Sequence, residues 1–106
     1  MAYKDITMVR GDTLAFTFKF KGLNQALDTA YFTCKANPTD DTPLFQKTLE
    51  DGIEADASGA YKVRVAPDDT EDIPAGSYYY DLQVGVNNDV YTILIGQLFL
   101  RQDVTN

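Results

Sequence analysis

The stretch YYYDLQVGVNNDVYTILI, residues 78–95, decides the fold of this chain. Apolar and polar residues alternate on both sides of Asn87-Asn88, and a period of two is typical of a strand with one buried face. Asn adopts the positive φ angles that a two-residue type I′ turn requires. The stretch therefore predicts a β-hairpin in which Val86 pairs with Asp89 across the turn.

The register of this hairpin predicts an apolar inner face. With a two-residue turn, Leu82 lies opposite Ile93 and Tyr80 lies opposite Ile95, whereas a three-residue turn would mix polar and apolar residues on each face. A glycine inside a strand often marks a β-bulge. We therefore expect the regular pairing to be interrupted at Gly96.

The outer face of the same hairpin carries apolar residues as well. In the predicted register Leu94 lies outside, beside Asp81 and Tyr79, although a strand of a monomeric sandwich needs only one apolar face. Exposed apolar patches mark contact sites. Tyr79, Asp81 and Leu94 are therefore the candidate residues of an interface with another protein or with a second copy, and we expect a homo-oligomer.

The same alternation runs through most of the chain. Turn residues, mainly Gly, Asn, Asp and Pro, separate the alternating runs. The expected strands are Ile6 to Val9, Leu14 to Phe20, Tyr31 to Ala36, Leu44 to Leu49, Tyr61 to Val65, Tyr78 to Val86 and Val90 to Leu100. One short helical turn is expected near Pro67-Ile73, with Asp68 or Asp69 as its N-cap. About seven strands without a linker predict one antiparallel, immunoglobulin-like β-sandwich domain over residues 1–106.

Composition and charge exclude several classes of partner. The chain has 106 residues, 44% hydrophobic and 24% charged, which is typical of one globular domain. Its 9 Lys and Arg and 16 Asp and Glu give a net charge of −7. Nucleic acids and anionic membranes attract basic proteins, so neither is an expected partner. The sequence begins without the pattern of a signal peptide, which predicts synthesis in the cytoplasm.

The sequence offers no recognisable catalytic machinery. It contains no His and no cofactor-binding motif, so we expect neither an enzyme nor a bound cofactor. The acids from Asp68 to Asp72 lack the spacing of an EF-hand calcium loop, and helix capping explains them better than metal binding does. Cys34 lies between Phe32 and Ala36, where a small buried residue is expected.

A carbohydrate-binding module is the alternative to a protein-contact module. The run Tyr78-Tyr79-Tyr80 must place at least one ring on the face opposite the core, and an exposed aromatic ring can stack on a sugar. Such a module would use Tyr79, with calcium at Asp68, Asp69 and Asp72. Because protein interfaces are enriched in Tyr, a protein partner is the favoured interpretation of Tyr79.

The order of the turn and strand motifs resembles a known pattern. The motifs are Arg10-Gly11-Asp12-Thr13, Leu27-Asp28-Thr29-Ala30, Gly59-Ala60-Tyr61-Lys62-Val63, Ile73-Pro74-Ala75-Gly76-Ser77 and a terminal Asp103-Val104-Thr105. The chain resembles the small immunoglobulin-like domains of phage and prophage tail proteins, and it is similar to the N-terminal domain of the baseplate upper-protein family.

The resemblance implies a function that involves no catalysis. It implies a structural or assembly module of a phage or prophage tail or baseplate, whose partners are other phage structural proteins or further copies of itself. The protein would be made in the bacterial cytoplasm and then become part of a virion or a phage-like particle. Members of that family usually continue into a coiled or receptor-engaging region, whereas this sequence ends at Asn106. A free-standing tail or head-completion subunit is therefore the other expectation.

Overall fold

The computed structural model describes residues 2–19, 27–55 and 60–104. These residues form strands, apart from one helical turn and the connecting loops. The strands are β1 (Ala2–Tyr3), β2 (Ile6–Val9), β3 (Leu14–Phe18), β4 (Thr29–Lys35), β5 (Phe45–Leu49), β6 (Gly52–Ala55), β7 (Tyr61–Val65), β8 (Gly76–Val86) and β9 (Asp89–Arg101), and α1 (Pro67–Thr70) lies between β7 and β8.

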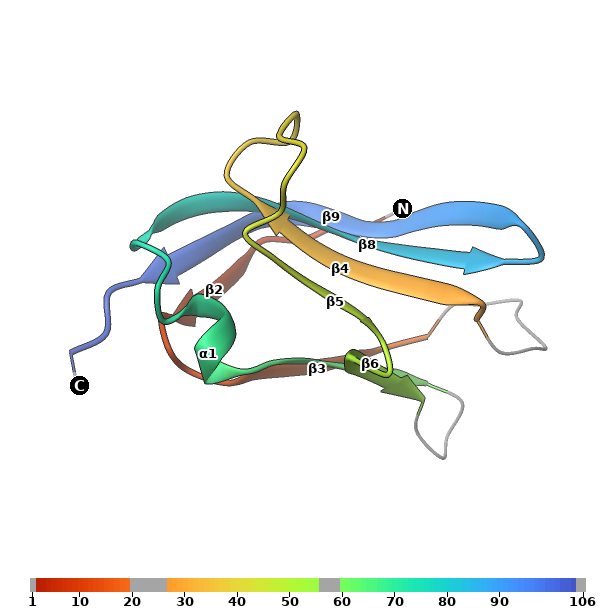
Figure 1. The fold of residues 1–106 in the computed structure, drawn as a ribbon, viewed down its shortest axis with the longest axis horizontal. Coiled ribbons are helices and arrows are strands. Elements are labelled where there is room, and N and C mark those ends of the chain that lie inside the picture. Colours follow the sequence, from red (N-terminus) through yellow and green to blue (C-terminus); the bar gives the residue numbers. More distant parts are fainter. Residues whose placement is uncertain (1, 20–26, 56–59, 105–106) are drawn as a thin grey trace.

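The strands pack as two layers, which Figure 1 shows one above the other. The upper layer has the strand order β9-β8-β4-β5, and β1 and β2 pair with β9 at its edge. The lower layer has the order β6-β7-β3. The chain passes from one layer to the other at the corner between β5 and β6, where Glu50 and Gly52 have φ angles of 67° and 101°. This arrangement is the predicted β-sandwich.

Two features of the sheet differ from the prediction. The described residues form nine strands rather than about seven, because β1 and β6 were not expected. With only two residues, β1 is too short to show any alternation. β6 begins at Gly52, and the pair Asp51-Gly52 indicated only a turn in the sequence. The sheet is also mixed rather than purely antiparallel, because β1 and β2 both run parallel to β9 and β5 runs parallel to β6. Phe20, at the end of one predicted strand, lies outside the described residues.

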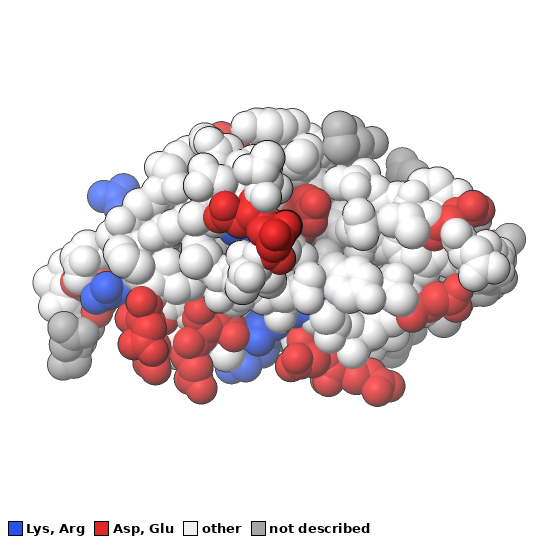
Figure 2. All heavy atoms as spheres, turned by 45° about the horizontal axis from the view of Figure 1, so that its top comes forward, with Lys and Arg blue, Asp and Glu red and all other residues white. Residues whose placement is uncertain are grey.

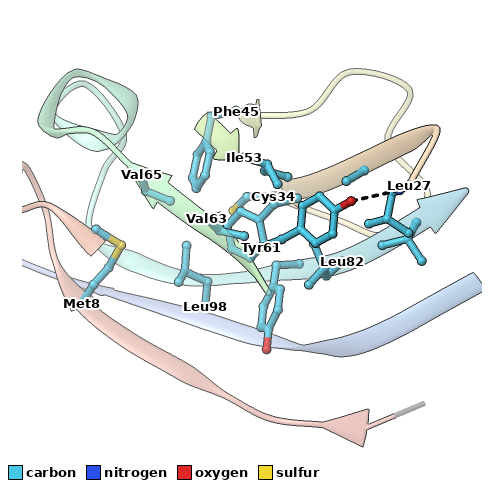
Figure 3. Close-up of a cluster of buried hydrophobic side chains, with 14 of the residues drawn as sticks. Met8, Leu27, Cys34, Phe45, Ile53, Tyr61, Val63, Val65, Leu82 and Leu98 are labelled. Atoms are coloured by element: carbon cyan, nitrogen blue, oxygen red, sulfur yellow. Dashed lines mark hydrogen bonds between the residues drawn. The ribbon is translucent and has the colours of Figure 1, made fainter. Parts of the chain in front are cut away.

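The core lies between the two layers. Its largest fully buried hydrophobic residues are Phe32, Cys34, Ile53, Val63, Val65, Leu82, Val84 and Leu98. Phe32 lies at its centre, with ring centroids 5.5 Å from Phe16, 6.1 Å from Phe45 and 5.3 Å from Tyr80. Residues from β2, β4, β6, β7, β8 and β9 converge on this region in Figure 3, so the core joins both layers.

Cys34 belongs to this core, as predicted. Its side chain is 1% exposed and points between the layers. Burial disfavours the thiolate and raises the pKa of Cys34 to about 12. A thiol with such a pKa is almost fully protonated at neutral pH, so Cys34 acts as a small apolar residue rather than as a nucleophile.

The turn of the β8–β9 hairpin is the predicted one. Val86 pairs with Asp89, and the two turn residues Asn87 and Asn88 have φ angles of 53° and 67°. Positive φ at both positions defines a type I′ turn, whose twist matches that of the flanking strands.

The predicted register is correct as far as the pair of Gln83 with Thr92, and beyond this pair it is wrong by one residue. Gln83 pairs with Thr92 as expected, but Leu82 pairs with Leu94 rather than with Ile93. Ile93 is therefore the extra residue of a β-bulge, which lies three residues before the expected position at Gly96. Leu94 and Ile95 consequently lie on the faces opposite to those predicted.

Gly96 serves a close approach of the N-terminal segment. The segment between β1 and β2 runs along the edge of β9 and contacts it here, and the Lys4 N–H donates to the Ile95 carbonyl over 2.9 Å. A Cβ atom on Gly96 would lie 2.0 Å from the Lys4 carbonyl oxygen, which also accepts a hydrogen bond from the Tyr80 hydroxyl. Only glycine leaves room for this contact. Burial raises the pKa of Tyr80 to about 12, with further contributions from Asp5 and Tyr3.

The helical turn is where the sequence predicts it, but its N-cap is Ala66 rather than Asp68 or Asp69. Asp69 instead accepts a hydrogen bond from the Ala66 N–H over 2.7 Å and forms an ion pair with Lys47, also at 2.7 Å. Proline at the first helical position favours this start, because its missing N–H would have no partner there. Of the two acids of α1, Asp69 is thus structural and Asp68 is exposed.

Candidate functional site

The outer face of the upper layer carries two of the three predicted interface residues. Because Tyr80 and Leu82 point into the core, their neighbours Tyr79 and Asp81 point outward on β8. Tyr79 pairs with Lys35 on β4 and with Gln97 on β9. We call this surface the concave face; its strand residues are Tyr31, Thr33, Lys35, Gln46, Tyr79, Asp81, Gln83 and Ile95.

A loop turns this face into a hollow. The β4–β5 loop, residues 36–44, rises above the upper layer in Figure 1, and Pro38, Asp41 and Pro43 form one wall. The hollow has a volume of about 570 Å³ and is open to solvent. In Figure 2, which brings the upper layer forward, uncharged atoms cover most of the visible surface and one small acidic group stands near its middle.

Two apolar side chains are exposed at the floor of the hollow. Tyr79 is 39% exposed on β8 and Ile95 is 36% exposed on β9. Asp81 lies between them, because it pairs with Ile95 on one side and follows Tyr79 along β8 by two residues. The floor therefore combines an aromatic ring and an aliphatic side chain with a carboxylate, and the aromatic ring is the component that protein interfaces are enriched in.

Asp81 carries a partly desolvated charge. Burial raises the pKa of its carboxyl group above the ordinary value, and the nearby Lys35 offsets part of the increase. Neither the Asp81 side chain nor the Lys35 side chain makes a hydrogen bond or an ion pair with another described residue. The carboxylate thus loses hydration in the free chain without gaining a direct partner.

We expect Asp81→Asn to raise the free energy of unfolding at neutral pH by up to about 1 kcal/mol, the scale of charge effects at partly exposed sites. A raised pKa means that the folded state holds the proton more tightly than the unfolded state does, so the wild type gains stability as the pH falls through the folded pKa toward the unfolded one. The variant lacks this gain, and its advantage should therefore shrink in acid. Urea unfolding at several pH values measures both effects; a variant less stable than wild type at neutral pH would contradict them.

Leu94, the third predicted residue, lies on the other side of the sheet. It pairs with Leu82 and packs against the core, so its predicted outward orientation is wrong. The bulge at Ile93 brings Ile95 to the position beside Asp81 that Leu94 was expected to occupy. Ile95 is the interface candidate that the sequence missed, because consecutive apolar residues give no sign of which one faces outward.

The acidic residues considered for calcium do not form a site. Among the described residues no group of three or more carboxylate, thiol or imidazole side chains gathers as a metal site would require. Of the three candidates, Asp69 is held by Lys47, while Asp68 and Asp72 are exposed.

Comparison with known proteins identifies the fold. No protein-family model matches the chain, and no curated protein matches its sequence. The natural killer cell receptor NKp44, a triggering partner in natural cytotoxicity, is similar in structure with a TM-score of 0.58 and 12% identity, over 97% of this chain and 100% of that one. The extracellular domain of the voltage-gated sodium channel β4 subunit has a TM-score of 0.51 and 13% identity, over 96% of this chain and 93% of that one.

No helix of the described chain has the length and apolar character needed to cross a membrane. The two similarities extend over nearly the whole chain at low sequence identity, and they concern the fold alone. The chain has an all-β, immunoglobulin-like sandwich fold.

Proposed function

We propose that this chain is a non-enzymatic structural module of a phage or prophage tail or baseplate, and that it acts through protein–protein contacts made by the concave face. The proposed contact rests on the floor of the hollow, where Tyr79 and Ile95 are exposed beside the partly desolvated Asp81. The phage setting is supported by the order of turn and strand motifs in the sequence.

The chemistry of the face favours a macromolecular partner. Aromatic side chains are enriched at protein interfaces, and an apolar centre with a polar rim is their usual arrangement. Here Tyr79 and Ile95 supply the apolar surface, while Thr33 and Gln46 supply polar groups on the two neighbouring strands and are joined by a hydrogen bond of 2.9 Å. The sodium channel β4 domain, which has the same fold, is described as a parallel homodimer in cell–cell adhesion. Other phage structural proteins and further copies of this chain are the proposed partners.

Incorporation into particles tests this function. In the bacterium that carries the gene, the wild-type protein should sediment with phage or phage-like particles after induction. Tyr79→Lys places a charge in the apolar centre and should lower incorporation at least about tenfold, the scale expected for a central interface residue. Quantitative mass spectrometry of gradient-purified particles measures the loss.

The control is Val90→Lys, which introduces the same side chain at a 63% exposed residue of β9 outside the concave face. This variant should be incorporated like the wild type. Absence of the wild-type protein from the particles, or equal incorporation of both variants, would contradict the proposal.

Carbohydrate binding by the same hollow is a second candidate, because Tyr31 and Tyr79 both line it. Isothermal titration with oligosaccharides of the host surface separates the two functions. A sugar that binds the wild type but not Tyr79→Ala would favour this candidate over a protein partner.

A further inference from the structure

We infer that two copies of this chain pack through their concave faces about a two-fold axis, with Lys35 of each copy facing Asp81 of the other. The inference rests on the proposed function, because it names the partner and the contact of the same face.

Lys35 and Asp81 lie diagonally across two neighbouring strands. Lys35 on β4 pairs with Tyr79, and Asp81 on β8 pairs with Thr33. Diagonal neighbours on a sheet face are about 7–8 Å apart, so the two charges influence one another without contact. Both side chains therefore retain hydrogen-bonding capacity toward whatever covers the face.

A two-fold axis brings these charges together in pairs. In an isologous contact a patch meets its own copy, so an adjacent cation and anion on one molecule meet the anion and the cation on the other. An axis that passes between Lys35 and Asp81 forms this contact twice. No partner with a different charge pattern is needed, because the patch is complementary to itself.

The position of Lys35 also addresses the main obstacle to self-association. Two chains with a net charge of −7 repel each other. Lys35 is the cation among the described residues that line the hollow, where it offsets part of the negative charge of Asp41 and Asp81. Charge attraction at the centre of the face thus acts against the long-range repulsion.

The face has the dimensions that a stable dimer requires. The molecule measures 44 × 31 × 21 Å, and in Figure 1, which looks along the shortest axis, the upper layer extends along the longest one. A stable interface covers about 800 Å² on each partner. A contact of that size takes in most of this face, with Tyr79 and Ile95 at its centre.

Charge reversal in two separate variants tests the contact. Lys35→Glu leaves two carboxylates at the paired positions, and Asp81→Lys leaves two ammonium groups. Each purified variant should self-associate at least about tenfold more weakly than the wild type, because like charges then meet twice. An equimolar mixture of the two should recover association as a heterodimer, since every contact now joins opposite charges. Sedimentation equilibrium over a concentration series measures all four samples.

The lower layer supplies a matched control. Glu54 and Lys62 are a cross-strand pair on β6 and β7, so Lys62→Glu and Glu54→Lys make the same charge changes away from the concave face. Both control variants should dimerise like the wild type, each alone as well as mixed.

The outcomes separate this inference from the proposed function. A wild type that stays monomeric up to about 1 mM, which corresponds to about 4 kcal/mol of binding free energy, would overturn the dimer. So would a mixture of the two variants that fails to associate. If Tyr79→Lys still blocks incorporation into particles in that case, the face binds a different protein and the proposed function stands. If the mixed variants associate but the wild-type protein is absent from the particles, the dimer is supported and the proposed phage function is contradicted.

Discussion

Gly96→Ala is expected to lower the free energy of unfolding by about 3 kcal/mol or more, the combined scale of an overpacked site and a lost buried hydrogen bond. The added methyl group would lie 2.0 Å from the Lys4 carbonyl oxygen, which belongs to backbone and has little room to move. The segment that joins β1 to β2 would have to leave β9. This movement would break the hydrogen bond between Lys4 and Ile95, and the Tyr80 hydroxyl would lose its acceptor, the Lys4 carbonyl.

Chemical unfolding of wild type and variant measures this loss, and hydrogen exchange locates it. Exchange should accelerate first at Lys4, whose N–H is bonded to β9. Gly76→Ala is the matched control, because there the nearest atom to the new methyl group is the Tyr78 hydroxyl oxygen at 3.6 Å, an ordinary contact. Equal stability of the two variants would show that the backbone of Lys4 does not lie as close to Gly96 as the structure places it.

Local patterns in the sequence account for most of the strands. In β7, for example, Tyr61, Val63 and Val65 are buried while Lys62 and Arg64 are exposed, as strict alternation predicts. The type I′ turn at Asn87-Asn88 was predictable because few residue pairs adopt two successive positive φ angles. Where one residue dictates the local backbone, the sequence is sufficient.

Local patterns in the sequence do not predict the bulge at Ile93. Ile93, Leu94 and Ile95 are similar in size and hydrophobicity, so each can face inward without a local penalty. The register is instead supported by distant residues. The N-terminal segment contacts β9 at Gly96, and β1 pairs with Leu94 and Ile95. These contacts join residues about ninety positions apart, and hydrophobic periodicity carries no information on them.

The candidate site could be predicted only in part for the same reason. Alternation along β8 is enough to place Tyr79 and Asp81 on one face. Their neighbour Lys35 and the loop wall at Pro38 and Pro43 come from a different part of the chain, and they reach the face through the pairing of β4 with β8. A hollow formed by two separated segments leaves no continuous motif in the sequence.

Leu94→Lys and Ile95→Lys should have opposite consequences, although the residues are adjacent. Leu94 pairs with fully buried Leu82 and packs on the core, so a lysine there should lower the free energy of unfolding by about 3 kcal/mol through lost apolar burial and a charge without a partner. Ile95 lies on the concave face, so its replacement should change stability by no more than about 0.5 kcal/mol, the range of ordinary surface substitutions.

The same two variants then separate folding from association. At a temperature where both are folded, Ile95→Lys should weaken dimer formation at least about tenfold, because it removes a central apolar contact and places a cation opposite Asp81, where it competes with Lys35 of the second copy for that carboxylate. Leu94→Lys, once folded, should keep the wild-type association, since its side chain does not reach the face. Urea unfolding and sedimentation on one set of samples give both quantities. A stable Leu94→Lys variant that fails to dimerise would place Leu94 outside and Ile95 in the core, and the bulge at Ile93 would have to be abandoned together with the interface built on it.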